Sequence, residues 1–213
     1  LDELFNFFLN TIDTTLRPQR SRDYEAGIRA RYNERSGLNV NFFYIETQDE
    51  IFFDPVNFLN TNLDGTTRRT GLELYLYAGL GILDLSAGYT YTDSEILEGQ
   101  YAGSVVPGVP AQRMTLTGRV SLGRGFSLSA NGVYVGQRPF IGDFANTFSD
   151  QEDYFVMNAK LKYERGPFSL FIDLNNLTGA EYSEYGVLGG FPVEEAIYPS
   201  PEFNALAGLA LNF

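Results

Sequence analysis

The sequence contains no cysteine and no histidine among its 213 residues. Without cysteine, the chain has neither disulfide bonds nor thiolate metal sites. Without histidine, it offers no Ser-His-Asp constellation and no histidine ligand for zinc or haem. The sequence therefore gives no catalytic residue, no metal site and no cofactor, and we expect the chain not to be an enzyme.

Positive charge and long apolar runs are also scarce. Lys and Arg together number 15 against 27 Asp and Glu, which gives a net charge of −12. Such an acidic chain does not suit nucleic acid, whose phosphate backbone binds basic surfaces. No run of about 18 apolar residues is present, so the sequence predicts no transmembrane helix. By contrast, 22 glycines and an aromatic content of 15% favour strands and tight turns.

Nine segments alternate apolar and polar residues with a period of two, which is typical of β-strands. In the first segment, Tyr24, Ala26 and Ile28 fall on one face, and Glu25 and Arg29 fall on the other. The segments cover residues 24–33, 38–45, 71–78, 83–92, 113–122, 126–134, 155–163, 168–175 and 204–213. This pattern alone fits two folds: a sandwich with the apolar face inward, or a barrel with the apolar face in lipid.

Three features favour the barrel. Short turns near residues 37, 81, 125 and 166 alternate with long loops at about 49–68, 93–111, 136–152 and 179–201. Transmembrane barrels connect their strands in this way and carry aromatic girdles, and Tyr24 and Tyr32 stand at the two ends of one apolar face. The Ala and Gly on the apolar faces would leave gaps in a packed core, whereas lipid tails conform to them. The sequence therefore predicts an all-β fold, an antiparallel transmembrane β-barrel in the bacterial outer membrane.

The strand count depends on residues 4–12, in which apolar residues occur at both odd and even positions, so that neither face would be polar. They form either the end of a tenth strand or a loop segment packed over the barrel mouth. Nine strands in an open sheet would leave two unpaired edges in lipid, and bacterial barrels have even strand numbers. We therefore expect the chain to be part of a larger barrel.

Four segments resemble motifs of the TonB-dependent outer-membrane receptors. "LRPQRSRDYEAGIRARY" (16–32) is similar to the family's Leu-Lys-Pro-Glu-Ser-like segment and Tyr-Glu-x-Gly strand, and "RRTGLELYL" (68–76) to its Arg-x-x-Gly-Val-Glu-Leu strand. "LFIDLNNLTGAEY" (170–182) resembles the penultimate strand, although Thr178 and Gly179 replace Phe and Asp. "YPSPEFNALAGLALNF" (198–213) resembles the closing strand, although Glu202 and Phe203 replace Gly and Arg.

The resemblance implies a barrel of twenty-two strands with an N-terminal plug inside and a TonB box before the plug. We therefore expect residues 1–213 to be the C-terminal portion of the barrel, with the plug and earlier strands absent. The resemblance also implies that Leu209, Leu211 and Phe213 belong to the C-terminal signal by which such barrels are recognised for insertion.

The function that the resemblance implies is TonB-dependent active import of a scarce nutrient, for example an iron–siderophore chelate. The expected partners are outer-membrane lipid, the TonB system through the missing N-terminal region, and a small-molecule ligand such as a metal chelate. The receptor is expected to act as a monomer. The alternatives are a passive outer-membrane pore or small structural barrel, and a soluble sheet domain that binds sugar or protein.

Aromatic residues in the long loops predict a vestibule that grips an amphipathic ligand by stacking, although they would serve equally for packing of loop against loop. The candidates are Phe140, Phe144, Tyr182, Tyr185 and Phe191.

Charged residues on the polar faces predict lumen or plug contacts, by ion pairs and hydrogen bonds, or the lining of a substrate path. The candidates are Arg29, Arg31, Glu73, Arg113 and Arg119. The segment "NTNLDG" (60–65) resembles the start of a calcium loop, but its twelfth position is Gly71 rather than Glu, which favours a glycine turn.

Overall fold

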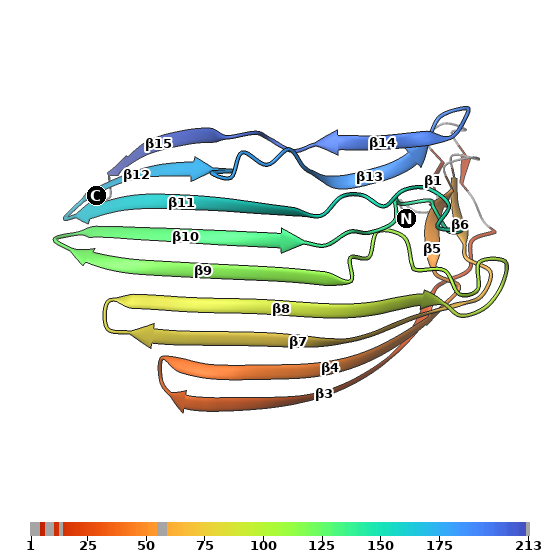
Figure 1. Cartoon of the computed structure of the whole chain (residues 1–213), viewed down its shortest axis with the longest axis horizontal. Coiled ribbons are helices and arrows are strands. Elements are labelled where there is room, and N and C mark those ends of the chain that lie inside the picture. The colour runs from red at the N-terminus through yellow and green to blue at the C-terminus, as the bar shows by residue number, and fades with distance from the viewer. Residues whose placement is uncertain (1–4, 7–10, 13–14, 55–58, 212–213) are drawn as a thin grey trace.

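A computed structural model of the chain describes residues 5–6, 11–12, 15–54 and 59–211. Its main element is an antiparallel nine-stranded sheet in the order β15-β12-β11-β10-β9-β8-β7-β4-β3 (Figure 1). Its strands are β3 (Arg20–Asn33), β4 (Ser36–Gln48), β7 (Thr66–Leu80), β8 (Leu83–Ile96), β9 (Gln112–Gly123), β10 (Phe126–Val135), β11 (Tyr154–Arg165), β12 (Phe168–Asn175) and β15 (Asn204–Leu211). Among the described residues, no helix has the length and apolar character needed to cross a membrane.

Three two-stranded sheets accompany the large one. They are β1 (Phe5–Asn6) with β2 (Thr11–Ile12), β5 (Ile51–Asp54) with β6 (Leu59–Asn62), and β13 (Ser183–Gly189) with β14 (Glu194–Pro199). The described part of residues 4–12 thus forms its own hairpin and is not a tenth strand of the large sheet; residues 4 and 7–10 lie outside the described residues.

All nine predicted strands are confirmed, and several are longer than the alternation suggests. Strand β7 begins at Thr66 and β8 runs to Ile96, so the neighbouring loops are shorter than expected. The hairpins β5–β6 and β13–β14 lie inside predicted loops and were missed. Their strands have four to seven residues, which is too short for a two-residue period to stand out.

The two ends of the sheet differ as the sequence predicts (Figure 1). At one end, two-residue turns at 34–35, 81–82, 124–125 and 166–167 join the strands. Gly81, Gly125 and Gly166 in these turns have positive φ, which glycine adopts without steric cost, and Arg124 has positive φ as well. At the other end, the connections span residues 49–65, 97–111, 136–153 and 176–203 and bring the small hairpins together.

The strand register aligns apolar residues with apolar residues, and polar with polar, across the sheet. One continuous row joins Ile28, Val40, Leu74, Tyr89, Met114, Tyr134 and Phe155 on seven successive strands. The next row along joins Gly27, Asn41, Glu73, Thr90 and Arg113. The sheet therefore has one apolar face and one polar face, because side chains alternate along each strand.

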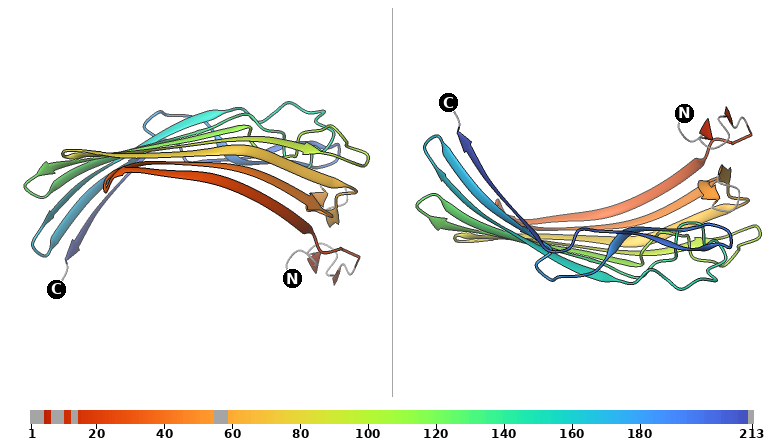
Figure 2. Two further views of the ribbon diagram at one scale, coloured as in Figure 1. Left: turned by 90° about the horizontal axis from the view of Figure 1, so that it is seen from below. Right: turned by 90° about the horizontal axis from the view of Figure 1, so that it is seen from above.

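The apolar face is exposed. Ile28, Leu116 and Leu209 have 70%, 59% and 62% of their surface exposed, which does not fit a sandwich in which a second sheet covers this face. The sheet is curved, and its edge strands β3 and β15 bend to the same side, as in a section of barrel wall (Figure 2). An exposed apolar face on a curved wall is the arrangement of a membrane barrel.

Part of the predicted insertion signal lies on this face. Leu209 pairs with Leu170 and Leu211 pairs with Phe168 at the outer edge of the sheet. Both leucines are exposed, and Phe213 lies outside the described residues. The recognition role of the three residues stays a prediction.

Aromatic rings on the polar face lie over glycines of the neighbouring strand. Phe43 covers its partner Gly71, and Phe171 covers its partner Gly208, so closely that a Cβ on either glycine would overlap the ring. A strand glycine has no side chain to pack, and a cross-strand ring fills the space that it leaves.

A methyl group at Gly71 should therefore destabilise the wall. In Gly71→Ala, the new Cβ would meet the Tyr91 carbonyl oxygen and the Phe43 ring. We expect a loss of about 1–3 kcal/mol in the free energy of unfolding, as for other overpacked sites. Urea unfolding of the protein in detergent micelles measures this change. The control is Gly118→Ala, whose nearest neighbour, Leu85 Cδ2, is 3.4 Å away; equal stability of the two variants would contradict the prediction.

A charge on the apolar face should impair membrane insertion. In Leu116→Arg, the cation would lie in lipid at the middle of β9, at a cost of about 2–4 kcal/mol. Thr117→Arg places the same charge on the polar face one residue away. We expect the folded, heat-modifiable band on a gel to decrease for the first variant only. Similar yields for both would show that the apolar face does not contact lipid.

Candidate functional site

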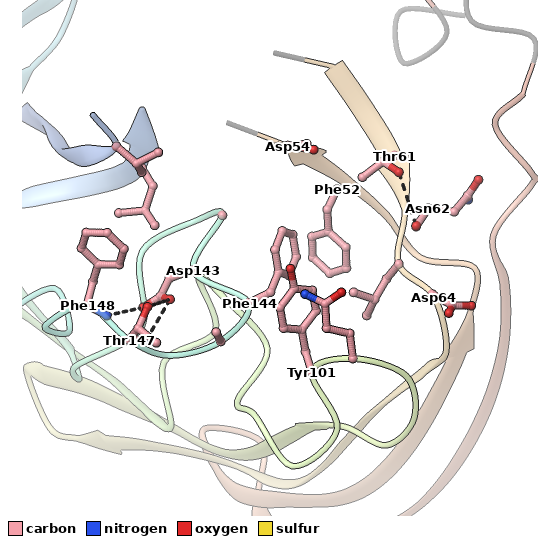
Figure 3. A pocket seen from close by; sticks show the side chains of 16 residues that line it. Phe52, Asp54, Thr61, Asn62, Asp64, Tyr101, Asp143, Phe144, Thr147 and Phe148 are labelled. Atoms are coloured by element: carbon pink, nitrogen blue, oxygen red, sulfur yellow. Dashed lines mark hydrogen bonds between the residues drawn. The ribbon is translucent and has the colours of Figure 1, made fainter. Parts of the chain in front are cut away.

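The long loops enclose a pocket of about 570 Å³ (Figure 3). The β5–β6 hairpin contributes Phe52 and Thr61 to its wall, and the 97–111 connection contributes Tyr101. The 136–153 connection contributes Asp143 and Phe144, while Leu188 and Val193 come from the β13–β14 region. Residues that are far apart in the sequence thus share one cavity at the loop end of the sheet.

Three aromatic rings form the apolar side of this pocket (Figure 3). The ring of Phe144 meets Phe52 edge-on at a centroid distance of 5.1 Å and stacks with Tyr101 at 5.5 Å. The three rings pack in turn against a small buried cluster of Leu63, Ile96 and Val106. They therefore both join the loops and present aromatic surface to the cavity.

Asp143 and Asn146 fix the loop that carries Phe144. The Asp143 carboxylate accepts hydrogen bonds from the backbone N–H groups of Thr147 and Phe148, each at 3.0 Å. The Asn146 amide donates to the carbonyl of Val105 at 3.2 Å and accepts from its N–H at 2.7 Å. These bonds tie residues 136–153 to residues 97–111 and hold Phe144 in the wall of the pocket.

A half-buried ion pair fixes the base of the β5–β6 hairpin. Arg69 and Glu50 lie 2.6 Å apart, and Thr67 donates a hydrogen bond to the same carboxylate. Asn62 at the end of β6 donates to the carbonyls of Arg17 and Asp49. The segment 60–65, considered above as a calcium loop, is therefore the end of β6 and a glycine turn at Gly65 that leads into β7.

The structure separates the five predicted vestibule residues. Phe144 lines the pocket, whereas Phe140, only 4% exposed, and Tyr182 line a neighbouring acidic pocket of about 610 Å³. Tyr185 meets Tyr198 edge-on within the β13–β14 hairpin, and Phe191 is fully exposed between its strands. Sequence reasoning omitted Tyr101 from the candidates, although it is an aromatic residue in a long loop like the others.

The charged lumen candidates occupy different parts of the polar face. Arg29 and Arg31 are exposed on β3, at the edge of the sheet. Glu73 accepts a hydrogen bond from Asn41 at 3.5 Å. Arg113 lines a pocket of about 350 Å³ near the loops, and Arg119 lines one of about 330 Å³ near the short turns. The five residues do not form one site.

The long loops carry much of the negative charge. Arg138 is the only Lys or Arg in residues 49–65, 97–111, 136–153 and 176–203. The same segments hold fourteen of the 27 acidic residues: Asp49, Glu50, Asp54, Asp64, Glu98, Asp143, Asp150, Glu152, Asp153, Glu181, Glu184, Glu194, Glu195 and Glu202. Such a field repels anions that approach from the loop side and attracts cations.

Comparison with solved structures shows the same fold. One similar structure is the siderophore receptor PiuA from Acinetobacter baumannii. The match covers 90% of this chain and 28% of the PiuA chain, with a TM-score of 0.74 and 22% sequence identity. Another is the ferric yersiniabactin uptake receptor FyuA from Yersinia pestis. That match covers 92% of this chain and 30% of the FyuA chain, with a TM-score of 0.78 and 20% sequence identity.

Sequence comparison gives the same result. A curated relative, the probable TonB-dependent siderophore receptor PiuA of Acinetobacter baumannii, is 26% identical over 191 residues, which are 82% of this chain. The match spans 25% of that relative's length. The family model described as "TonB dependent receptor-like, beta-barrel" matches residues 1–177. The chain therefore belongs to the TonB-dependent receptor β-barrel family, whose members lie in the outer membrane of Gram-negative bacteria.

Proposed function

We propose that this chain forms wall and mouth of an outer-membrane receptor that imports a scarce nutrient, such as an iron–siderophore chelate, with energy from TonB. TonB-dependent receptors bind small-molecule ligands and work with TonB. The curated relative named as a probable siderophore receptor supports a metal chelate as the ligand. In this proposal the receptor is a monomer, residues 1–213 are the C-terminal part of its barrel, and the plug and TonB box precede them.

One observation supports this function beyond family membership: the aromatic pocket lies over the loop end of a membrane-facing wall. Its volume of about 570 Å³ is in the range of small-molecule sites. Phe52, Tyr101 and Phe144 provide surface for stacking, and Asp54 and Asp64 add polar groups at the rim. The pocket therefore suits an amphipathic ligand that arrives from outside the cell.

The polar face would meet the plug or the passing ligand. Arg29, Arg31, Arg113 and Arg119 with Glu73 supply donors and acceptors along this face, at positions from the loops to the short turns. We assign them to plug contacts because wall charges without partners of opposite sign gain hydrogen bonds from a polar domain inside the barrel.

The proposed transport is tested by growth and uptake in the native host under iron limitation. Deletion of the receptor gene should abolish uptake of a radiolabelled iron chelate from a panel of siderophores. Deletion of tonB should abolish the same uptake, because active transport needs the energised partner. Uptake that persists without TonB and rises linearly with concentration would instead support a passive pore.

The aromatic pocket predicts a graded effect of two matched substitutions. Phe144→Ala removes the ring that contacts both Phe52 and Tyr101, whereas Phe191→Ala removes a fully exposed ring. We expect the first to weaken binding of the transported chelate by roughly tenfold, since buried aromatic anchors contribute about 1–3 kcal/mol. Fluorescence quenching on the full-length receptor measures it. An equal or larger loss for Phe191→Ala would place the ligand elsewhere.

A further inference from the structure

A smaller pocket of about 350 Å³ lies where the polar face of the sheet meets the loops. Its floor consists of side chains from β9, β10 and β11, among them Arg113, Val133 and Asn158. Its rim consists of Arg138, Tyr182 and Glu184 from the loops. It is thus a pocket on the lumen side with two arginines in its wall.

Arg138 is buried and has spare hydrogen-bonding capacity. The residue is 4% exposed, and its Nη2 group donates to the carbonyls of Ser183 at 3.0 Å and Glu184 at 3.2 Å. Its Nη1 group is buried without a hydrogen-bond partner among the described residues. The guanidinium carbon lies 5.7 Å from the ring centre of Tyr154. Burial lowers the pKa of Arg138, because desolvation disfavours its charged form.

The lack of an ion pair is notable in so acidic a region. Fourteen carboxylates lie in the long loops, yet within the described part of the chain neither Arg138 nor Arg113 forms a salt bridge. Even Glu184, which lines the same pocket, stays beyond ion-pair distance. Burial of a cation that forms no ion pair is unfavourable, and the nearby charge of Glu184 offsets only part of the desolvation of Arg138.

The two arginines act on the same region. Tyr154, which also lines the pocket, experiences the charges of both Arg138 and Arg113. Arg138 is held in place by the backbone, since its carbonyl accepts from the Gln151 N–H at 2.8 Å. Arg113 is exposed and free to adjust, so it can close on a group that enters the pocket.

We propose that this pocket binds a carboxylate group between Arg113 and Arg138. Arg113 donates hydrogen bonds to the carboxylate directly, and Arg138 supplies the second positive charge from the wall. The carboxylate comes either from an acidic side chain of the receptor's own N-terminal region, inside the barrel, or from the transported ligand. In the second case the inference rests on the proposed function. At about 350 Å³ the pocket is smaller than the aromatic pocket of about 570 Å³.

The test uses the full-length receptor in detergent, with citrate as the carboxylate probe. Arg113→Gln removes one charge at an exposed residue whose side chain makes no hydrogen bond within the described residues, so folding should be retained. Arg138→Lys keeps the positive charge but replaces the planar guanidinium, with its several N–H donors, by one ammonium group. The matched control is Arg17→Gln, which removes an exposed arginine that pairs with the partly buried Asp49 outside this pocket. Thermal melting and calorimetric titration with citrate are measured for all four proteins.

Two results support the proposal and separate the two sources. If the ligand supplies the carboxylate, citrate binds the wild type and the control, and Arg113→Gln weakens it about tenfold or more without a change in melting. If the receptor supplies it, citrate has no effect, and Arg113→Gln lowers the melting midpoint by about 2 °C or more relative to Arg17→Gln. In either case Arg138→Lys gives a smaller change of the same kind.

Two other results would overturn the proposal. One is citrate binding that Arg113→Gln does not weaken. The other is no citrate binding together with melting of Arg113→Gln that equals that of Arg17→Gln. None of these measurements uses transport, so a failed uptake experiment and a failed carboxylate site are distinguishable.

Discussion

Backbone hydrogen bonding is the constraint on which the rest of this structure depends. In a bilayer no water satisfies N–H and C=O groups, so every strand must pair on both sides or lie outside the hydrocarbon. The simplest arrangement pairs each strand of the wall with the strand that follows it in the chain. The nine strands from β3 to β15 are paired in this way. Among the described residues β3 pairs only with β4 and β15 only with β12, so both edges offer positions for further strands.

The pairing pattern also determines where functional groups can lie. The short turns supply few side chains, and the pocket of about 330 Å³ at their end of the wall is lined mainly by strand residues. The pockets to which the long connections contribute gather at the other end. Asn176 shows how firmly a loop can be anchored there. It is 2% exposed with positive φ, its amide donates to the carbonyls of Ala180 and Pro201, and its oxygen accepts from Ala180 N–H. One side chain thus joins the end of β12 to the segment that leads into β15.

The wall was predictable from sequence because its signal is local and repeated. Each of the nine strands alternates over many residues, and three of the four short connections contain a glycine, namely Gly81, Gly125 or Gly166. The short hairpins were not predictable in this way. Ile51–Asp54 reads as an apolar cluster, and its pairing with β6 depends on contacts at Glu50 and Asn62 that no period reveals.

The site was predictable only as a set of residue types. Phe144 and Phe191 are both loop aromatics in the sequence, yet one lies in a three-ring cluster and the other is fully exposed. The difference arises from contacts between three loops that are far apart in the chain. Arg138 is a similar case, since a single arginine in an acidic loop gives no indication that the fold will bury it beside Arg113.

The contrast between two-residue turns and long connections has a consequence for how such a receptor can diverge. Adding one residue within a strand reverses which side chains meet lipid from that point onward, so the wall tolerates exchange of residues but not changes of length. Residues 49–65 and 136–153 can grow or shrink without altering any strand register. Variation in length is thereby directed to the loop end of the wall, where we propose that the ligand binds, so specificity can change while the span across the membrane stays the same.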